Sequence, residues 1–120
     1  GLDEILIGSD EVWHYEDKAA SPIKFAVGLS AKQIASYAPS CGSVNLKHPI
    51  PEYVREGLHR FTHISARDDV SERLVQKVLG YKPVRVLDPT LLYDFPVYED
   101  DFTRKLEKEK YILTSFQKLE

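Results

Sequence analysis

The stretch that decides the fold begins with Thr62-His-Ile-Ser-Ala66 and continues through Arg67-Asp68-Asp69. Its first five residues are apolar enough for a central strand and too few for a helix. Asp68 or Asp69 can cap the helix that follows, and Asp69 with Glu72 has the spacing of a capping box. The apolar positions of this helix form one stripe that ends at Gly80: Val70, Leu74, Val75, Val78 and Leu79. The segment therefore predicts a strand followed by an amphipathic helix.

The same pattern continues in both directions from this unit. Lys82-Pro-Val-Arg-Val-Leu87 is the next predicted strand, and Asp88-Pro89 closes it because a residue before proline is driven out of helical geometry. Strands alternating with helices over short connections predict right-handed crossovers and a three-layer α/β domain. The other predicted elements are strands at about 3–7 and 33–37, a helix at about 51–61, an amphipathic helix carrying Tyr98, Phe102 and Leu106, and a strand at 111–116. The first of these strands is apolar at its centre, as a strand buried on both faces should be. The state of residues 20–30 stays open.

Composition excludes several classes of protein. With 42% hydrophobic and 29% charged residues in 120, the chain is globular, and a net charge of −3 with scattered Lys and Arg argues against a nucleic-acid partner. The single cysteine, Cys41, cannot form an internal disulfide, and no set of residues has metal-ligand spacing. No apolar stretch approaches the roughly 18 residues that span a bilayer. We expect a cytoplasmic protein without a transmembrane segment.

Domain organisation follows from the ends of the chain. The chain has no Met and begins shortly before a strand, so we expect an internal fragment. Residues 1–96 form a partial N-terminal α/β domain in this interpretation. Residues 97–120 then hold a connector helix and the first strand of a truncated second domain.

Small and polar residues follow each predicted strand, where ligands bind in an open parallel sheet. After the first strand, Gly8 permits close approach and the Ser9 hydroxyl suits phosphate or sugar oxygens, although Gly8-Ser9-Asp10 can also be a simple turn. Trp13 is either a core residue or a platform for a sugar ring. The remaining candidates at this edge are Ser40, Gly42 and Asp88, for which turn and strand-end roles are the alternatives.

Arg67 is the strongest candidate for contact with an anion. It lies where a central strand meets the positive end of the best-defined helix, and an Arg there can hold a phosphate or carboxylate with two parallel hydrogen bonds. The alternative is an ion pair with Asp68, Asp69 or Asp88. Both interpretations stay open at this point.

Four short sequence blocks occur in a fixed order along the chain. They are Gly8-Ser9-Asp10-Glu11-Val12-Trp13, Ser36-Tyr37-Ala38-Pro39-Ser40-Cys41-Gly42, Ile64-Ser65-Ala66-Arg67-Asp68-Asp69-Val70-Ser71 and Val86-Leu87-Asp88-Pro89-Thr90-Leu91-Leu92. Together, in this order, they resemble the polysaccharide pyruvyl transferase family, and the likeness spans most of residues 1–95. It is not complete, because the family usually has Gln at Glu11, Asn at His14, an aromatic residue at Cys41 and Glu at Asp68.

The resemblance implies a Rossmann-like domain of a GT-B-like two-domain enzyme. It further implies transfer of a pyruvyl group from phosphoenolpyruvate to a sugar of a cell-surface polysaccharide, or to its nucleotide- or lipid-linked precursor, with ketal formation and no separate cofactor. Arg67 matches the Arg block of the family and becomes the candidate for binding the donor's anionic groups. Ser9, Asp10, Ser40 and Ser71 would line the same edge.

Two other functions remain as alternatives. One is the nucleotide-sugar-binding half of a GT-B glycosyltransferase, because one fold hosts many functions, and the other is a non-catalytic sugar-recognition domain. The general acid is not evident in this chain, and the resemblance implies that a His and other donor contacts come from the second domain. We therefore expect the fragment alone to be inactive with phosphoenolpyruvate.

Overall fold

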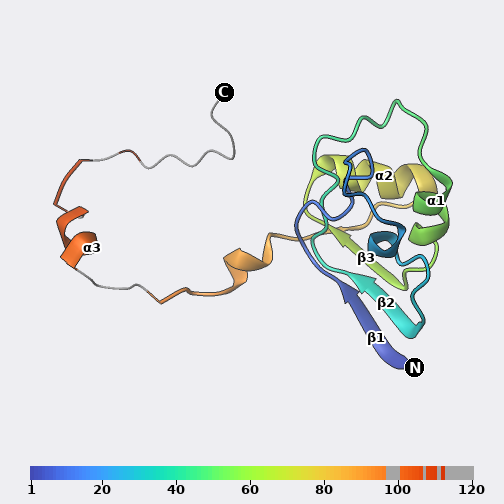
Figure 1. The fold of residues 1–120 in the computed structure, drawn as a ribbon, viewed down its shortest axis with the longest axis horizontal. Helices are drawn as coiled ribbons and strands as arrows, with labels where there is room; N and C mark the ends of the chain where they lie inside the picture. Colours follow the sequence, from blue (N-terminus) through green and yellow to red (C-terminus); the bar gives the residue numbers. More distant parts are fainter. Residues whose placement is uncertain (97–100, 107, 111, 113–120) are drawn as a thin grey trace.

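The computed structural model describes residues 1–96, 101–106, 108–110 and 112. Four parallel strands form one sheet in the order β1-β2-β3-β4, as expected for an α/β domain (Figure 1). The strands are β1 (Leu2–Ile7), β2 (Ala31–Ser36), β3 (His63–Ala66) and β4 (Val84–Arg85). The helices are η1 (Pro22–Phe25), α1 (Glu52–Leu58), α2 (Asp69–Leu79), η2 (Pro89–Leu92) and α3 (Asp101–Leu106), of which η1 and η2 are 3-10 helices.

Helix α2 forms as its apolar stripe predicts. Asp68 caps it by accepting a hydrogen bond from the Ser71 backbone N–H at 2.8 Å, and Gly80 ends it with a left-handed φ of 79°. The expected capping box of Asp69 with Glu72 is wrong, because the Glu72 carboxylate bonds Arg85 of β4 and Lys82 instead. Ion pairs with residues distant in the sequence thus replace the expected local hydrogen bond.

The other predicted elements occur with shifted boundaries. Residues 20–30, left open from the sequence, contain η1, and the fourth strand is only two residues long instead of six. The expected amphipathic helix appears as α3, although Tyr98 lies outside the described residues. The expected strand at 111–116 also lies outside them, apart from Ile112.

Successive neighbouring strands joined by right-handed crossovers place every connecting helix on one face of the sheet. A single hydrophobic cluster fills that side, and α1 and α2 lie over it (Figure 1). The cluster combines strand residues with residues of the loops and helices: Ile34, Ile64, Trp13, Phe25, Val54, Leu58, Phe61, Leu74 and Val75. The described residues therefore form two layers rather than the expected three.

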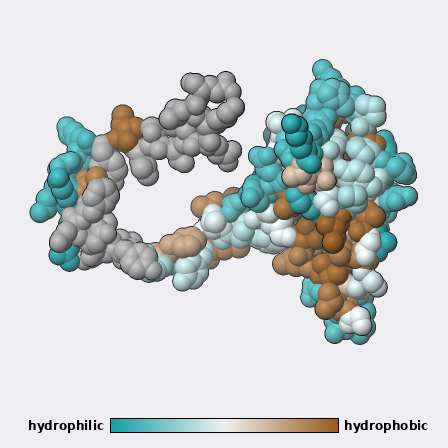
Figure 2. Space-filling view, in the orientation of Figure 1, coloured by the Kyte–Doolittle hydropathy of each residue, from teal (hydrophilic) through white to brown (hydrophobic). Residues whose placement is uncertain are grey.

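The opposite face of the sheet is apolar and open. Leu6 of β1 and Val84 of β4 are 62% and 67% exposed, so the expectation that the first strand is buried on both faces is wrong. Ala35 and His63 lie between them in register on the same face. Figure 2 shows apolar side chains gathered over the strands. In the part of the chain that the structure describes, no helix has the length and apolar character needed to cross a bilayer.

Close contact between η1 and α1 gives a test of this packing. A Cβ on Gly57 of α1 would lie 2.1 Å from the Phe25 carbonyl oxygen and 2.6 Å from its Cβ. Alanine normally stabilises a helix interior by about 0.5–1 kcal/mol over glycine, but overpacking costs about 1–3 kcal/mol. We expect Gly57→Ala to lower the free energy of unfolding in urea by about 1–3 kcal/mol. The exposed neighbour Glu56, changed to Ala, should stay within about 0.5 kcal/mol of the parent; a stabilised Gly57→Ala would contradict this packing.

Candidate functional site

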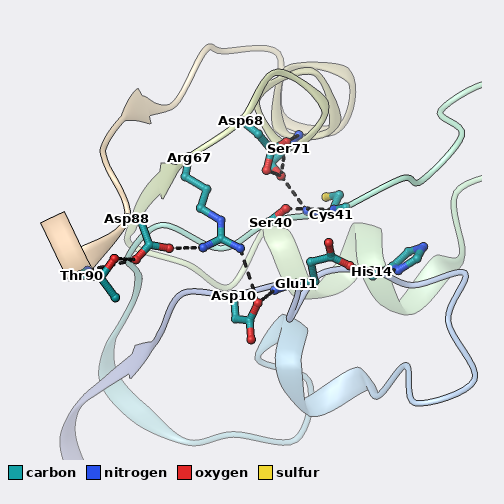
Figure 3. Close-up of polar contacts among 11 residues, drawn as sticks. Asp10, Glu11, His14, Ser40, Cys41, Arg67, Asp68, Ser71, Asp88 and Thr90 are labelled. Atoms are coloured by element: carbon teal, nitrogen blue, oxygen red, sulfur yellow. Dashed lines mark hydrogen bonds and ion pairs between the residues drawn. The ribbon is translucent and has the colours of Figure 1, made fainter. Parts of the chain in front are cut away.

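Polar residues from four strand ends meet at the carboxyl edge of the sheet (Figure 3). Backbone contacts continue beyond the strands and hold these ends in line. The Tyr37 N–H donates to the Ile7 carbonyl at 2.9 Å, and the Val86 N–H donates to the Ala66 carbonyl at 3.0 Å. The Ser40 N–H donates to the Asp10 carbonyl at 2.8 Å. We call the edge formed by Asp10, Ser40, Arg67 and Asp88 the rim.

The Arg67 guanidinium is the centre of the rim. It forms an ion pair with the Asp88 carboxylate, and its second terminal nitrogen lies 3.5 Å from the Asp10 carboxylate (Figure 3). Its side chain is 23% exposed. One cation directly after β3 therefore links the loops that follow β1 and β4. Of the ion pairs expected from the sequence, the one with Asp88 forms.

The two carboxylates around Arg67 are held very differently. Asp88 also accepts hydrogen bonds from the Thr90 N–H at 3.0 Å and the Thr90 hydroxyl at 2.7 Å. These bonds, with Arg67, hold the pKa of Asp88 below its usual range. The Asp10 side chain is 87% exposed and bonds the following Glu11 N–H at 2.8 Å. Asp88 is thus a fixed partner of Arg67, whereas Asp10 is an exposed one.

The candidate serines Ser40 and Ser71 serve mainly to hold the loops. Ser71 is fully buried; its hydroxyl donates to Asp68 and accepts the Cys41 backbone N–H at 2.8 Å. The Ser40 hydroxyl accepts the Gly42 N–H at 2.9 Å, and its side chain is also buried. Both hydroxyls are therefore engaged beneath the surface of the rim.

The remaining candidates divide between the surface and the core. Gly8 is exposed with no neighbour where a Cβ would stand, and the half-buried Ser9 has no side-chain hydrogen bond within the described residues. Trp13 is fully buried, stacks on Phe25 and donates its indole N–H to the Lys24 carbonyl at 3.0 Å. Trp13 thus lies beneath the rim in the core and does not line its surface.

Sequence reasoning missed two neighbours of these residues. Thr90 fixes Asp88, and the Asp-Pro-Thr spacing of an Asx turn is the signal that predicts such a contact. The Glu11 carboxylate lies against Gly42, where an added Cβ would come within 2.6 Å of its oxygen. Only the folded loops show that contact. Among the described residues, no group of three His, Cys, Asp or Glu side chains is placed to hold a metal ion.

The chain belongs to the class of open parallel α/β sheets. Proteins of this class commonly bind small ligands at the edge where the strands end. The sequence matches the model of the family described as polysaccharide pyruvyl transferase over residues 2–118. The chain belongs to this family of transferases of polysaccharide biosynthesis. No curated protein and no solved structure matched the chain.

The Cys41 thiol gives a prediction about pH and reactivity. Burial raises the pKa of Cys41 to about 12, so the native thiol stays protonated at pH 8. We expect no reaction of the folded chain with a thiol-specific reagent at pH 8, and one equivalent of reaction after unfolding in urea. Because the pKa of Cys41 is higher in the folded chain than in the unfolded chain, the protonated thiol favours the folded state, and this contribution to the free energy of unfolding is complete below about pH 8.5. It is lost as the pH rises toward 12. Rapid labelling of the folded chain would contradict this assignment.

Proposed function

We propose that this chain takes part in transfer of a pyruvyl group from phosphoenolpyruvate to a sugar of a cell-surface polysaccharide or its precursor. The observation that supports the proposal is the family match over residues 2–118, in a chain whose strand ends present a charged rim. The product would be a ketal, with phosphate released. The donor itself carries the transferred group, so the proposal requires no separate cofactor.

The reaction sets three physical requirements. A general acid protonates the terminal carbon of the enol, which leaves positive charge on the neighbouring carbon. Two sugar hydroxyls add to that carbon, giving up their protons, as the bond to the phosphate oxygen breaks. The carboxylate and phosphate of the donor must be held throughout by cations and N–H donors. In this proposal the general acid comes from a second α/β half that faces the rim.

Arg67 is the proposed partner of the donor's anionic groups. In the present arrangement its single positive charge faces two carboxylates, Asp10 and Asp88, which together would repel an anion. Asp88 is anchored by Thr90, whereas Asp10 is exposed and lies 3.5 Å away. We therefore propose that the donor displaces the Asp10 side chain and that Asp88 keeps the guanidinium in position.

The first test is the reaction itself, with the natural protein that contains these 120 residues. Incubation with phosphoenolpyruvate and candidate acceptor sugars should yield pyruvylated sugar, detected by mass spectrometry, and an equal amount of phosphate. Phosphoenolpyruvate should also raise the unfolding temperature, because a ligand that binds only the folded state stabilises it. Stabilisation by nucleotide sugars but not by phosphoenolpyruvate would overturn the proposal.

Variants of the rim test the separate roles of its charges. Arg67→Ala should lower kcat/KM by about tenfold to a hundredfold through the lost charged hydrogen bonds, and Arg67→Lys should restore only part of it. Asp88→Asn should weaken phosphoenolpyruvate binding because the guanidinium loses its anchor. Asp10→Asn should strengthen that binding, since it removes a competing charge from the same cation. Titration calorimetry measures both, and weaker binding by Asp10→Asn than by Asp88→Asn would contradict these roles.

A further inference from the structure

A surface groove lies between α2 and the loop that leads from β2 to α1. Figure 1 shows this loop passing over α2. The groove has a volume of about 430 Å³. Three aliphatic residues, one amide and three basic residues line it: Val44, Leu46, Val70, Asn45, Lys47, Arg73 and Lys77.

Hydrogen bonds hold the loop against the helix and so maintain the groove. At one end the Cys41 N–H donates to the Ser71 hydroxyl, and at the other the Lys77 ammonium donates to the Leu46 carbonyl at 2.7 Å. Between them, the Glu16 carboxylate accepts the Asn45 N–H at 3.0 Å. These hydrogen bonds fix the position of the loop beside α2 and so keep the groove open.

The lining carries an unbalanced positive charge. Lys47, Arg73 and Lys77 contribute three cations and no acidic residue lines the groove, although the whole chain has a net charge of −3. Within the described part of the chain, the Lys47 ammonium has no hydrogen-bond or ion-pair partner. Arg73 donates from Nε to the Asp69 carbonyl at 3.1 Å, and its charge also acts on the Asp69 carboxylate one turn away. Most of the N–H donors of these side chains remain available to an anion.

The groove also has a direction. Residues 70, 73 and 77 lie on one face of α2 and span about 10 Å along its axis. Val70 stands in the first turn, next to Ser71, whose hydroxyl holds the loop beside the rim. The groove therefore runs from the neighbourhood of the rim outward along α2. Its aliphatic residues make it a poor site for a bare ion and a suitable one for an anion attached to a less polar group.

We infer that this groove binds the phosphate groups of the carrier to which the acceptor sugar is linked. The inference rests on the proposed function and adds to it the place on the chain where the carrier's phosphate groups bind. Lys47, Arg73 and Lys77 hold the phosphate oxygens, and the aliphatic residues contact the adjoining part of the carrier. A nucleoside diphosphate and a prenyl diphosphate share this chemistry.

Direct binding tests the groove without depending on catalysis. Titration calorimetry of the natural protein with geranyl diphosphate, uridine diphosphate and inorganic diphosphate gives three affinities, and geraniol serves as the uncharged comparison. Lys47→Gln with Arg73→Gln should weaken binding of the tightest diphosphate by about tenfold or more, as expected when charged hydrogen bonds are lost. Lys18→Gln, at an exposed lysine outside the groove, is the matched control. Circular dichroism checks that each variant is folded.

The outcomes separate the sources of the phosphate. If geranyl diphosphate binds most tightly, the carrier is a lipid. If uridine diphosphate binds most tightly, the carrier is a nucleotide. Equal affinities for the diphosphates mean that the groove recognises the phosphates alone. An affinity unchanged in the double variant, or reduced equally in Lys18→Gln, overturns the inference. These measurements need no phosphoenolpyruvate, so the groove can bind diphosphates even if the proposed reaction does not occur. The two proposals can therefore be refuted separately.

Discussion

The buried Ser71 hydroxyl is the constraint on which both the rim and the groove depend. It donates to the Asp68 carboxylate that caps α2 and accepts the Cys41 N–H of the loop after β2. Since Ser71 is fully buried, its loss would leave that N–H without a partner, at a cost of about 1–3 kcal/mol. One hydroxyl thus ties the start of the helix to the loop that bounds both regions.

Local patterns predicted the elements that local interactions stabilise. Helix α2 has its own cap, stripe and terminal glycine, and it forms over the residues expected. The capping box failed because Glu72 pairs with Arg85 and Lys82, 13 and 10 positions further along the chain. The sequence also could not show how many faces of the first strand are buried. A run such as Ile5-Leu-Ile7 is compatible with one covered face or two.

Much of the rim could be predicted because parallel strands deliver their carboxyl ends to one edge. That rule brings Asp10, Arg67 and Asp88 together without any knowledge of their side chains. It does not predict which hydroxyls form hydrogen bonds within the loops or that Trp13 lies in the core. The groove had no signal at all, because its two walls, at 44–47 and 70–77, meet only in the folded chain.

The two regions differ in how they would discriminate between anions. At the rim one cation faces two carboxylates, so a ligand gains the full attraction of Arg67 only by displacing Asp10. At the groove three cations face no lining acid, so an anion binds without displacing a charge. Under the proposed function, this contrast favours a donor that offers both a carboxylate and a phosphate at the rim. The groove would then recognise mainly the charge of its ligand and less its shape. Such a site can hold a carrier while the attached sugar extends toward the reacting carbon.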